Sequence, residues 1–364
     1  MKITIVAGAR PNFMKISPII HEIHKNNLNQ GTNKIEYRLI HTGQHYDKKM
    51  SESFFIDLNI PKPHVNLGAG GGTQAEQTAA IMIGFEKELI ANPCDLVLVV
   101  GDITSTMACA ITAQKLKIKV AHVEAGIRSG DWLMPEEINR LVTDSISNYY
   151  FTTSELANLN LLKSGVDIES IFYVGNTMID TLLSLKESFR KPEIWDKFNL
   201  KNNSYIVLTL HRPSNVDDSK KLIDLIKEIL NETRNVPIIF PVHPRTLKIL
   251  TEANFSNERL IMSEPLGYLE FNYLVKNSLA VVTDSGGITE ETSVLKIPCM
   301  TLRDNTERPE TIELGTNELL GTNPKAIKPA MDKLFKGEWK KGSEIPLWDG
   351  KTSERIVKVL LKLK

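Results

Sequence analysis

Short apolar runs alternate with longer amphipathic segments from the start of the chain. The first half carries the runs ITIVAG, EYRLIHTG, DLVLVVGD, KVAHVEAG and YYFTTS, with helical patterns between them. Strands that are buried on both faces are continuously apolar, so this pattern predicts a parallel sheet covered by helices. One of these helices is expected to begin after Thr73, because Thr73 and Glu76 have the spacing of a capping box.

The same alternation restarts in the second half of the chain. Strands are expected at SYIVLTLH, VPIIFPVH, RLIMSEP, LAVVTDSGG, IPCMTLR and NELLGT. We therefore predict an α/β fold with two doubly wound domains. The expected segments are a first domain at 1–172, a connecting helix and linker at 173–203, a second domain at 204–345, and a terminal helix at 346–364 that packs back on the first domain. Because this last helix is basic and amphipathic, a membrane-surface role is the alternative.

Composition narrows the class of protein. A chain of 364 residues exceeds one ordinary core, and 41% hydrophobic and 24% charged residues are typical of a globular protein in water. A net charge of zero lacks the basic bias of nucleic-acid-binding proteins. No run approaches the ~20 apolar residues of a membrane span, and the first apolar run is too short for a signal peptide. The expected compartment is the cytoplasm.

The sequence gives no indication of a metal or a cofactor. Cys94, Cys109 and Cys299 are widely spaced in or near apolar runs, which favours reduced core residues over disulfides or a zinc site. The first turn reads GARPNFMK, which is not the glycine pattern of a dinucleotide site. Neither a Walker loop nor a nucleophile elbow is present, so no cofactor is expected.

Candidate chemistry follows the strands of the first half, because doubly wound sheets bind ligands at the carboxyl ends of their strands. Arg10 follows the first strand, with Lys15 about a turn later, so backbone N–H groups and Arg10 could hold a phosphate; an ordinary turn is the alternative. Asp102 follows another strand and could instead cap the next helix. Glu124 follows the strand KVAHV, where an arginine could pair with it.

The stretch HVEAGIRSGDWLMPEEINR adds further charges beyond Glu124. Glu136 and Arg140 are four residues apart, so they can pair on one face of a helix. Negative charge at the start of a helix is also favourable in itself, which is the alternative role of Glu136. Glu137 and Asp131 are interpreted as ordinary helix-start and loop charges.

The second half carries polar groups at several strand ends. His211 and Arg212 follow one expected strand, and His243 and Arg245 follow the next. Phe271 could belong to the core or stack on a base. The remaining candidates share one strand-to-helix turn, in which small residues let backbone amides approach a phosphate and an acid could reach ribose hydroxyls: Ser285, Gly286, Gly287 and Glu291.

Together these motifs give the chain a family resemblance. In order they are GARPNFMK, TGQH, EQTA, GDITST, HVEAGIRSGDWLMPEEINR, VGNTMIDTL, HRPSN, PVHP, EPLGYLEF, TDSGGITEE and RDNTERPE. The chain resembles the non-hydrolysing UDP-N-acetylglucosamine 2-epimerases nearly from end to end. The resemblance implies two Rossmann-like domains facing across a cleft, the GT-B-like architecture, and a homodimer. It also implies reversible inversion at C2 of UDP-GlcNAc to UDP-ManNAc, through elimination of UDP to a 2-acetamidoglucal and re-addition.

The resemblance assigns roles to the candidate residues. Asp102, Glu124 and Glu136 resemble the acid–base set, with Arg140 and Arg10 as charge partners and Lys15 in the same first motif. His211 resembles the group near the departing phosphate. The UDP side is implied to consist of Ser285, Gly286, Gly287, Glu291, Phe271 and His243. Tyr46 and Asp47 differ from residues that other members place near a second, regulatory UDP-GlcNAc site, so activation by substrate is not expected. A related UDP-2,3-diacetamido sugar is the alternative substrate, and a glycosyltransferase is the alternative class.

Overall fold

The computed structural model describes residues 1–29, 34–44 and 55–363. The chain forms two compact units. Unit 1 contains Met1–Ser184 and Pro346–Lys364, and unit 2 contains Leu185–Ile345. The segment expected as a linker at 173–203 is therefore divided between the units.

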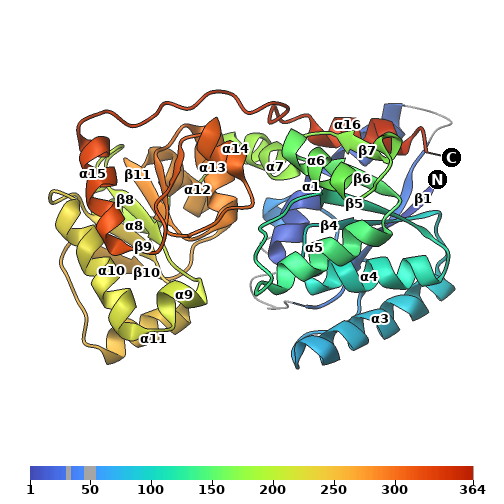
Figure 1. The fold of residues 1–364 in the computed structure, drawn as a ribbon, viewed down its shortest axis with the longest axis horizontal. Helices are drawn as coiled ribbons and strands as arrows, with labels where there is room; N and C mark the ends of the chain where they lie inside the picture. Colours follow the sequence, from blue (N-terminus) through green and yellow to red (C-terminus); the bar gives the residue numbers. More distant parts are fainter. Residues whose placement is uncertain (30–33, 45–54, 364) are drawn as a thin grey trace. The chain divides into compact units, whose positions relative to one another are not determined.

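Unit 1 is built on a parallel seven-stranded sheet in the order β3-β2-β1-β4-β5-β6-β7 (Figure 1). The strands are β1 (Lys2–Ala7), β2 (Glu36–His41), β3 (Val65–Asn66), β4 (Leu96–Val100), β5 (Lys119–Ala125), β6 (Tyr149–Thr152) and β7 (Ile171–Tyr173). Its helices are α1 (Arg10–Asn29), α3 (Gln74–Ala91), α4 (Thr104–Lys115), α5 (Pro135–Ile146), α6 (Glu155–Lys163), α7 (Thr177–Leu185) and α16 (Thr352–Leu360). The expected capping box is confirmed, because Thr73 accepts the Glu76 N–H and Glu76 accepts the Thr73 N–H.

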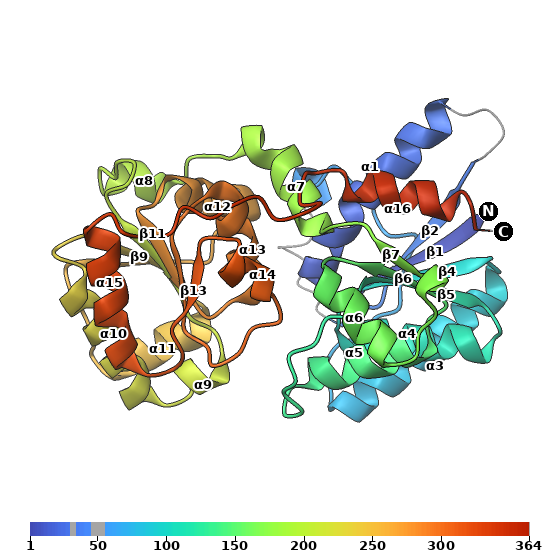
Figure 2. The ribbon, with the colours of Figure 1, turned by 45° about the horizontal axis from the view of Figure 1, so that its top comes forward.

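The end of the chain returns to unit 1, where α16 lies beside α1 (Figure 2). Asp180 of α7 accepts the backbone N–H groups of Thr352 and Ser353 at 3.0 and 2.7 Å. The first turn of α16 is thus capped by a side chain from another helix. Helix α7 is in turn attached to α1, since the Thr181 hydroxyl donates to the Met14 carbonyl at 2.6 Å. Because of these contacts, unit 1 extends beyond residue 172 and includes residues up to Ser184.

Unit 2 is built on a parallel six-stranded sheet in the order β10-β9-β8-β11-β12-β13. Its strands are β8 (Ile206–Thr209), β9 (Ile238–Pro241), β10 (Leu260–Ser263), β11 (Ala280–Thr283), β12 (Cys299–Thr301) and β13 (Asn317–Leu319). Its helices are α8 (Glu193–Lys197), α9 (Pro213–Val216), α10 (Ser219–Glu232), α11 (Pro244–Glu252), α12 (Tyr268–Asn277), α13 (Gly286–Leu295), α14 (Pro309–Glu313) and α15 (Ile327–Phe335). The predicted α/β class with two doubly wound units is confirmed.

The strand order of each sheet reverses beside its first strand. In unit 1, β1 lies between β2 and β4, and in unit 2, β8 lies between β9 and β11. The chain leaves these neighbouring strands toward opposite faces of the sheet, which opens a crevice at their carboxyl ends. The topology therefore directs attention to the residues after β1 and β4 and to those after β8 and β11. Among the described helices, none is both long and apolar enough to cross a membrane.

Candidate active site

Lys15 and the buried Glu124 form an ion pair at the strand ends of unit 1. Lys15 lies on α1, and Glu124 lies near the end of β5 with a backbone φ of 69°. The pairing of β5 with β6 shifts register between Val123 and Ala125, so Glu124 occupies a β-bulge. A left-handed conformation is costly for a glutamate, and bulges commonly re-aim side chains next to active sites. The ion-pair partner of Glu124 is thus a lysine, where an arginine was the alternative considered from the sequence.

Asp102 lies at the adjoining strand end, after β4. A Cβ placed on the preceding Gly101 would lie 3.2 Å from the Lys15 Nζ and 3.5 Å from the Glu124 Oε2, so this turn adjoins the ion pair. The Arg140 Nη2 donates to the Asp102 Oδ2 at 2.5 Å. Asp102 does not cap α4, whose N-cap is Ile103 without a side-chain bond. The structure thus brings together Lys15, Glu124, Asp102 and Arg140.

The roles expected for Glu136 and Glu137 need correction. Arg140 donates to the Glu137 Oε2 at 2.7 Å and forms no pair with Glu136. Glu137 is buried and also accepts N–H groups from Ser129 and Gly130, so it ties the loop before α5 to the helix. Burial alone would raise the pKa of Glu137, but these donors and Arg140 lower it below its ordinary value. The half-buried side chain of Glu136 has no hydrogen bond or ion pair with another described residue.

The first turn of unit 1 is organised differently from the expectation. The Asn12 Oδ1 accepts the N–H groups of Gly8 and Ala9 at 3.2 and 3.0 Å, and the Asn12 amide donates to the Val100 carbonyl at 3.0 Å. Two N–H groups that could have held a phosphate are therefore already bonded. Arg10 begins α1 beside them. Asn12 instead holds the turns after β1 and β4 together.

A buried cluster behind these turns was missed by the sequence reasoning. His122 of β5 contacts the Asp144 Oδ1 through its Nδ1 at 2.7 Å and the Gly101 carbonyl through its Nε2 at 2.8 Å. The Asp144 Oδ2 accepts from Arg128 at 2.6 Å and from the Gly126 N–H at 3.0 Å. Burial alone would raise the pKa of Asp144, but His122 and Arg128 hold it below its ordinary value. A histidine within a strand that is buried on both faces needs two partners, and that signal could have revealed the cluster.

In unit 2, His211 and Asp284 form a pair across β8 and β11. The His211 Nδ1 lies 2.8 Å from the Asp284 Oδ1, and Asp284 also accepts the backbone N–H groups of His211 and Arg212. Asp284 is fully buried, whereas about half of the His211 side chain is exposed. Burial alone would raise the pKa of Asp284, but the histidine, the Arg212 N–H and the Asn215 amide hold it below its ordinary value. Asp284 was not among the site residues predicted from the sequence.

The start of α13 follows directly after Asp284. Ser285 is its N-cap and makes no side-chain cap bond. A Cβ placed on Gly287 would meet no atom within 4 Å, whereas one on Gly286 would lie 3.3 Å from the Arg303 Nη1. Arg303 is itself fixed by two bonds to the Glu307 carboxylate, at 2.8 and 2.7 Å. Backbone donors at a helix start next to a guanidinium suit an anionic group such as a phosphate.

The other residues expected on the UDP side take different positions. Glu291 is buried on α13 beside Tyr268 and Asn272; burial raises its pKa to about 7, and nearby Glu290 adds to this. Phe271 is partly buried and packs against the unit 2 core. His243 is exposed and caps α11, since its Nδ1 accepts the Arg245 N–H at 3.3 Å.

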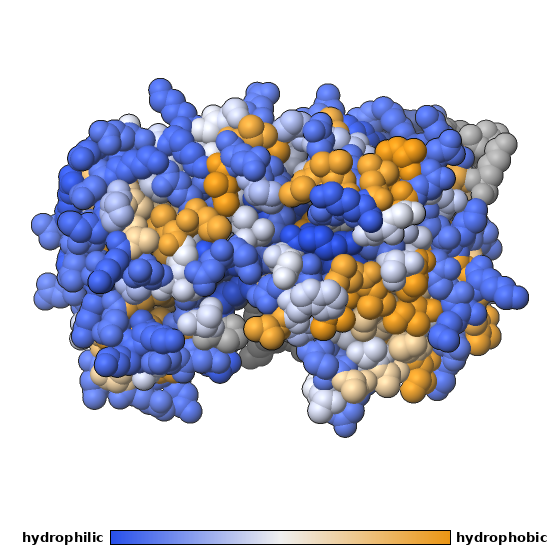
Figure 3. Space-filling view, viewed as in Figure 1, coloured by the Kyte–Doolittle hydropathy of each residue, from blue (hydrophilic) through white to orange (hydrophobic). Residues whose placement is uncertain are grey.

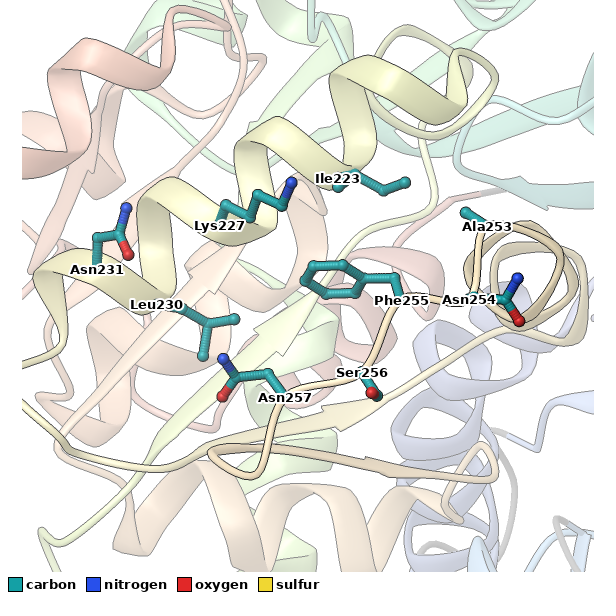
Figure 4. A pocket seen from close by; sticks show the side chains of 9 residues that line it. All are labelled: Ile223, Lys227, Leu230, Asn231, Ala253, Asn254, Phe255, Ser256 and Asn257. Carbon is teal, nitrogen blue, oxygen red and sulfur yellow. The ribbon is translucent and has the colours of Figure 1, made fainter.

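Tyr46 and Asp47, where the motif departs from its relatives, lie outside the described residues. A hollow of about 440 Å³ in unit 2 lies between α10 and the loop that leads into β10 (Figure 4). That loop precedes its strand, so the hollow is at the amino end of the sheet, opposite the strand ends discussed above. Across the described residues, no three His, Cys, Asp or Glu side chains are grouped as a metal site.

Comparison with known proteins places this architecture in a class of enzyme. The crystal structure of Methanocaldococcus jannaschii UDP-GlcNAc 2-epimerase in complex with UDP-GlcNAc and UDP matches with a TM-score of 0.89 and 44% identity, covering 100% of both chains. The fold is thus that of the GT-B-like isomerases. The family model described as UDP-N-acetylglucosamine 2-epimerase matches residues 27–361. The chain therefore belongs to the UDP-N-acetylglucosamine 2-epimerase family.

Two relatives illustrate that members of this family are named for different UDP-sugars. The UDP-N-acetylglucosamine 2-epimerase of Methanocaldococcus jannaschii is 45% identical over 99% of each chain. The UDP-2,3-diacetamido-2,3-dideoxy-D-glucuronate 2-epimerase of Pseudomonas aeruginosa is 37% identical over 100% of each chain. Family membership fixes the reaction type as an isomerisation, and these relatives act on different sugars.

Proposed function

We propose that this protein reversibly converts UDP-N-acetylglucosamine to UDP-N-acetylmannosamine, which supplies N-acetylmannosamine-type sugars for surface polysaccharides. The observation that carries the proposal is the pair of anchored carboxylates at adjoining strand ends of unit 1, Asp102 held by Arg140 and Glu124 held by Lys15. Inversion at C2 requires groups that remove and return a proton on a carbon of low acidity. The end-to-end similarity to an epimerase crystallised with UDP-GlcNAc and UDP supports the same substrate here.

The reaction we propose has two balanced halves. A carboxylate of unit 1 takes the C2 proton while the C1–O bond breaks, which gives 2-acetamidoglucal and UDP. A UDP phosphate oxygen then forms the C1–O bond again, and an acid returns a proton to C2 on the opposite face. Asp102, Glu124 and Glu136 are the proposed acid–base set. Lys15 and Arg140 stabilise carboxylate charge and fix its position.

Unit 2 is proposed to bind UDP. The N–H groups at the start of α13, around Ser285, Gly286 and Gly287, are proposed to take the phosphates. Arg10 of unit 1 is a further proposed substrate-binding residue. His211, oriented by Asp284, stabilises the departing phosphate oxygen, as preorganised donors do where charge develops. Glu291 is proposed to bond the ribose, and Phe271 and His243 are proposed to contact the base. No nicotinamide is needed, because no hydride moves.

One experiment tests the proposal directly. The protein is incubated with UDP-GlcNAc in D2O and the C1 and C2 protons are followed by NMR. Deuterium at C2 together with the appearance of UDP-ManNAc is expected. Free ManNAc would instead indicate a hydrolysing enzyme, and the absence of exchange would refute the epimerase. Retained exchange in the Glu124→Gln/Glu136→Gln double variant would refute the acid–base assignment.

A second candidate substrate is a UDP-2,3-diacetamido sugar, which the 37% identity to the Pseudomonas aeruginosa enzyme favours. That substrate carries a second acetamido group at C3 and a carboxylate. A direct comparison of kcat/KM for the two UDP-sugars decides between them. We expect UDP-GlcNAc to be preferred, because the relative of higher identity is named for it; a preference for the diacetamido sugar would reverse the assignment.

The proposed assembly is a homodimer in the cytoplasm. Unit 1 shows areas of apolar surface (Figure 3), and its large exposed apolar residues include Ile83 and Ile90 on α3, Ile138 on α5, and Leu156 and Leu159 on α6. Contiguous exposed apolar surface marks an interaction site more often than chance. Light scattering at increasing concentration is expected to give twice the monomer mass, and a monomer throughout would contradict this.

A further inference from the structure

His122 is a buried titratable side chain that the proposed reaction does not use. It lies on β5, two residues before Glu124, and is completely inaccessible to solvent. Its Nε2 lies 2.8 Å from the Gly101 carbonyl and its Nδ1 lies 2.7 Å from the Asp144 Oδ1. A buried histidine with two such short contacts holds both neighbours in fixed positions.

The hydrogen-bond partners fix the orientation of this ring. A carbonyl oxygen only accepts, so the Nε2 donates to the Gly101 carbonyl. The Nδ1 contacts one oxygen of Asp144, whose other oxygen accepts from Arg128 and from the Gly126 N–H. The ring therefore bridges the turn after β4 and the carboxylate that holds the end of β5.

The contacts of this pair reach both turns that carry the candidate acids. Gly101 directly precedes Asp102, and its own N–H donates to the Val123 carbonyl at 3.0 Å. Gly126, held by Asp144, follows Glu124 by two residues. The left-handed backbone of Glu124 is therefore enclosed by bonds on both sides, and such a conformation persists only when its surroundings impose it.

We propose that His122 and Asp144 are a positioning pair that fixes Asp102 and Glu124 in the geometry for proton transfer at C2. This rests on the epimerase function proposed above. The pair does not touch the substrate; it acts through the Gly101 carbonyl and the Gly126 N–H.

Two neighbouring side chains also hold the pair in place. Arg128, which follows β5, donates to the Asp144 Oδ2 at 2.6 Å, and the Tyr150 hydroxyl of β6 donates to the backbone carbonyl of Asp144 at 2.9 Å. Burial raises the pKa of the Tyr150 hydroxyl to about 12.

The test compares two replacements of His122 in the full-length protein. His122→Asn is too short to reach the Gly101 carbonyl, whereas His122→Gln keeps an amide donor near the Nε2 position. With UDP-GlcNAc in D2O, we expect C2 exchange to fall roughly 10²-fold in His122→Asn and to recover roughly 10-fold of that loss in His122→Gln, since misplacement by about 1 Å has effects of this size. KM should change less than about 3-fold.

Asn148→Ala is the matched control. Asn148 accepts the Val120 N–H at 2.8 Å at the amino end of the same strand, far along β5 from Glu124. Asn148→Ala should lower stability and leave the exchange rate per folded molecule unchanged. UDP affinity measures whether unit 2 is folded in each variant. A purely structural role for His122 predicts the same behaviour as Asn148→Ala, and that result would overturn the proposal.

The outcomes separate the two hypotheses. Exchange in the wild-type protein with an unchanged rate in His122→Asn would refute the positioning role alone. Absence of exchange in the wild-type protein would refute the epimerase function and the positioning proposal with it.

Discussion

The two units share one construction but arrange charge at their strand ends differently. In unit 1, the carboxylates are paired with cations, as Glu124 with Lys15 and Asp102 with Arg140. In unit 2, the carboxylate of Asp284 lies beneath the surface and a half-exposed histidine faces outward. The same topology therefore carries carboxylates paired with a lysine and an arginine in one unit and a histidine–aspartate pair in the other. The loops after the strands, rather than the sheets, make this difference.

Among the substitutions that test this difference between the units, Glu124→Gln is expected to have the largest effect. The amide keeps the size of the side chain but cannot take a proton, and it leaves the Lys15 ammonium without its counter-charge. We expect C2 exchange to fall roughly 10³-fold, within the range of general-base contributions. UDP affinity, which depends on unit 2, should be unchanged by isothermal titration.

Asp95→Asn provides the control for this isosteric change. Asp95 accepts the Lys2 N–H at 2.7 Å at the amino end of the sheet, away from the strand ends of the site. It should retain exchange within about 2-fold of the wild-type protein. A rate for Glu124→Gln within about 10-fold of wild type would remove Glu124 from the acid–base set.

The corresponding change in unit 2 is Asp284→Asn. The amide replaces one accepting oxygen of Asp284 by an NH2 group, so the His211 ring loses its fixed orientation and kcat should fall roughly 10²-fold. In a double-mutant cycle with His211→Asn, the second change should add little, because the two residues act as one unit. Additive losses in the cycle would show that Asp284 acts only through the backbone N–H groups of His211 and Arg212.

The sequence predicted the main strands because central strands of a parallel sheet need continuous apolar runs. It missed β3 and β7, the two edge strands of the sheet in unit 1, which have only two and three residues. The rule that ligands bind at the carboxyl ends of the strands then led to Asp102, Glu124 and His211 without further information. The ends of the strands were therefore predictable from local pattern and topology alone.

Which side chains pair with one another was less predictable than where each residue lies along its strand or helix. The helix spacing permits Arg140 to pair with a residue three or four positions away, and only the packing of α5 on the sheet selects Glu137 over Glu136. His122 and Asp144 are 22 residues apart, so no local pattern links them. Glu124 of β5 pairs with Lys15 of α1, because a bulge turns the Glu124 side chain in a direction that strand alternation does not predict.

The adjacent Glu136 and Glu137 sharpen the distinction between proton transfer and structure within unit 1. Glu137→Gln breaks a buried pair with Arg140, so it should lower the free energy of unfolding by about 3 kcal/mol in chemical denaturation. Glu136→Gln should change stability by less than about 0.5 kcal/mol, because Glu136 has no partner among the described residues. Its C2 exchange should nevertheless fall roughly 10²-fold. Equal stability of the two variants would contradict the assignment of Glu137 as the structural carboxylate.

The smallest effect is a pH dependence of stability that unit 2 owes to Glu291. Burial raises its pKa from 4.5 to about 7, so the folded protein holds a proton that the unfolded chain releases in this range. The linkage relation then requires stability to decrease as pH rises through this window, by about 2 kcal/mol between roughly pH 5 and pH 7. Glu291→Gln cannot titrate and should flatten this slope in urea unfolding. Asp284 and Asp144, whose pKa values are lowered, contribute stability that is lost only below their ordinary range, at more acidic pH. Burial also raises the pKa of Glu310, so Glu310 changes stability with pH in the same direction as Glu291. If the slope remained in Glu291→Gln and disappeared in Glu310→Gln, the titrating group would be Glu310 and not the proposed ribose contact.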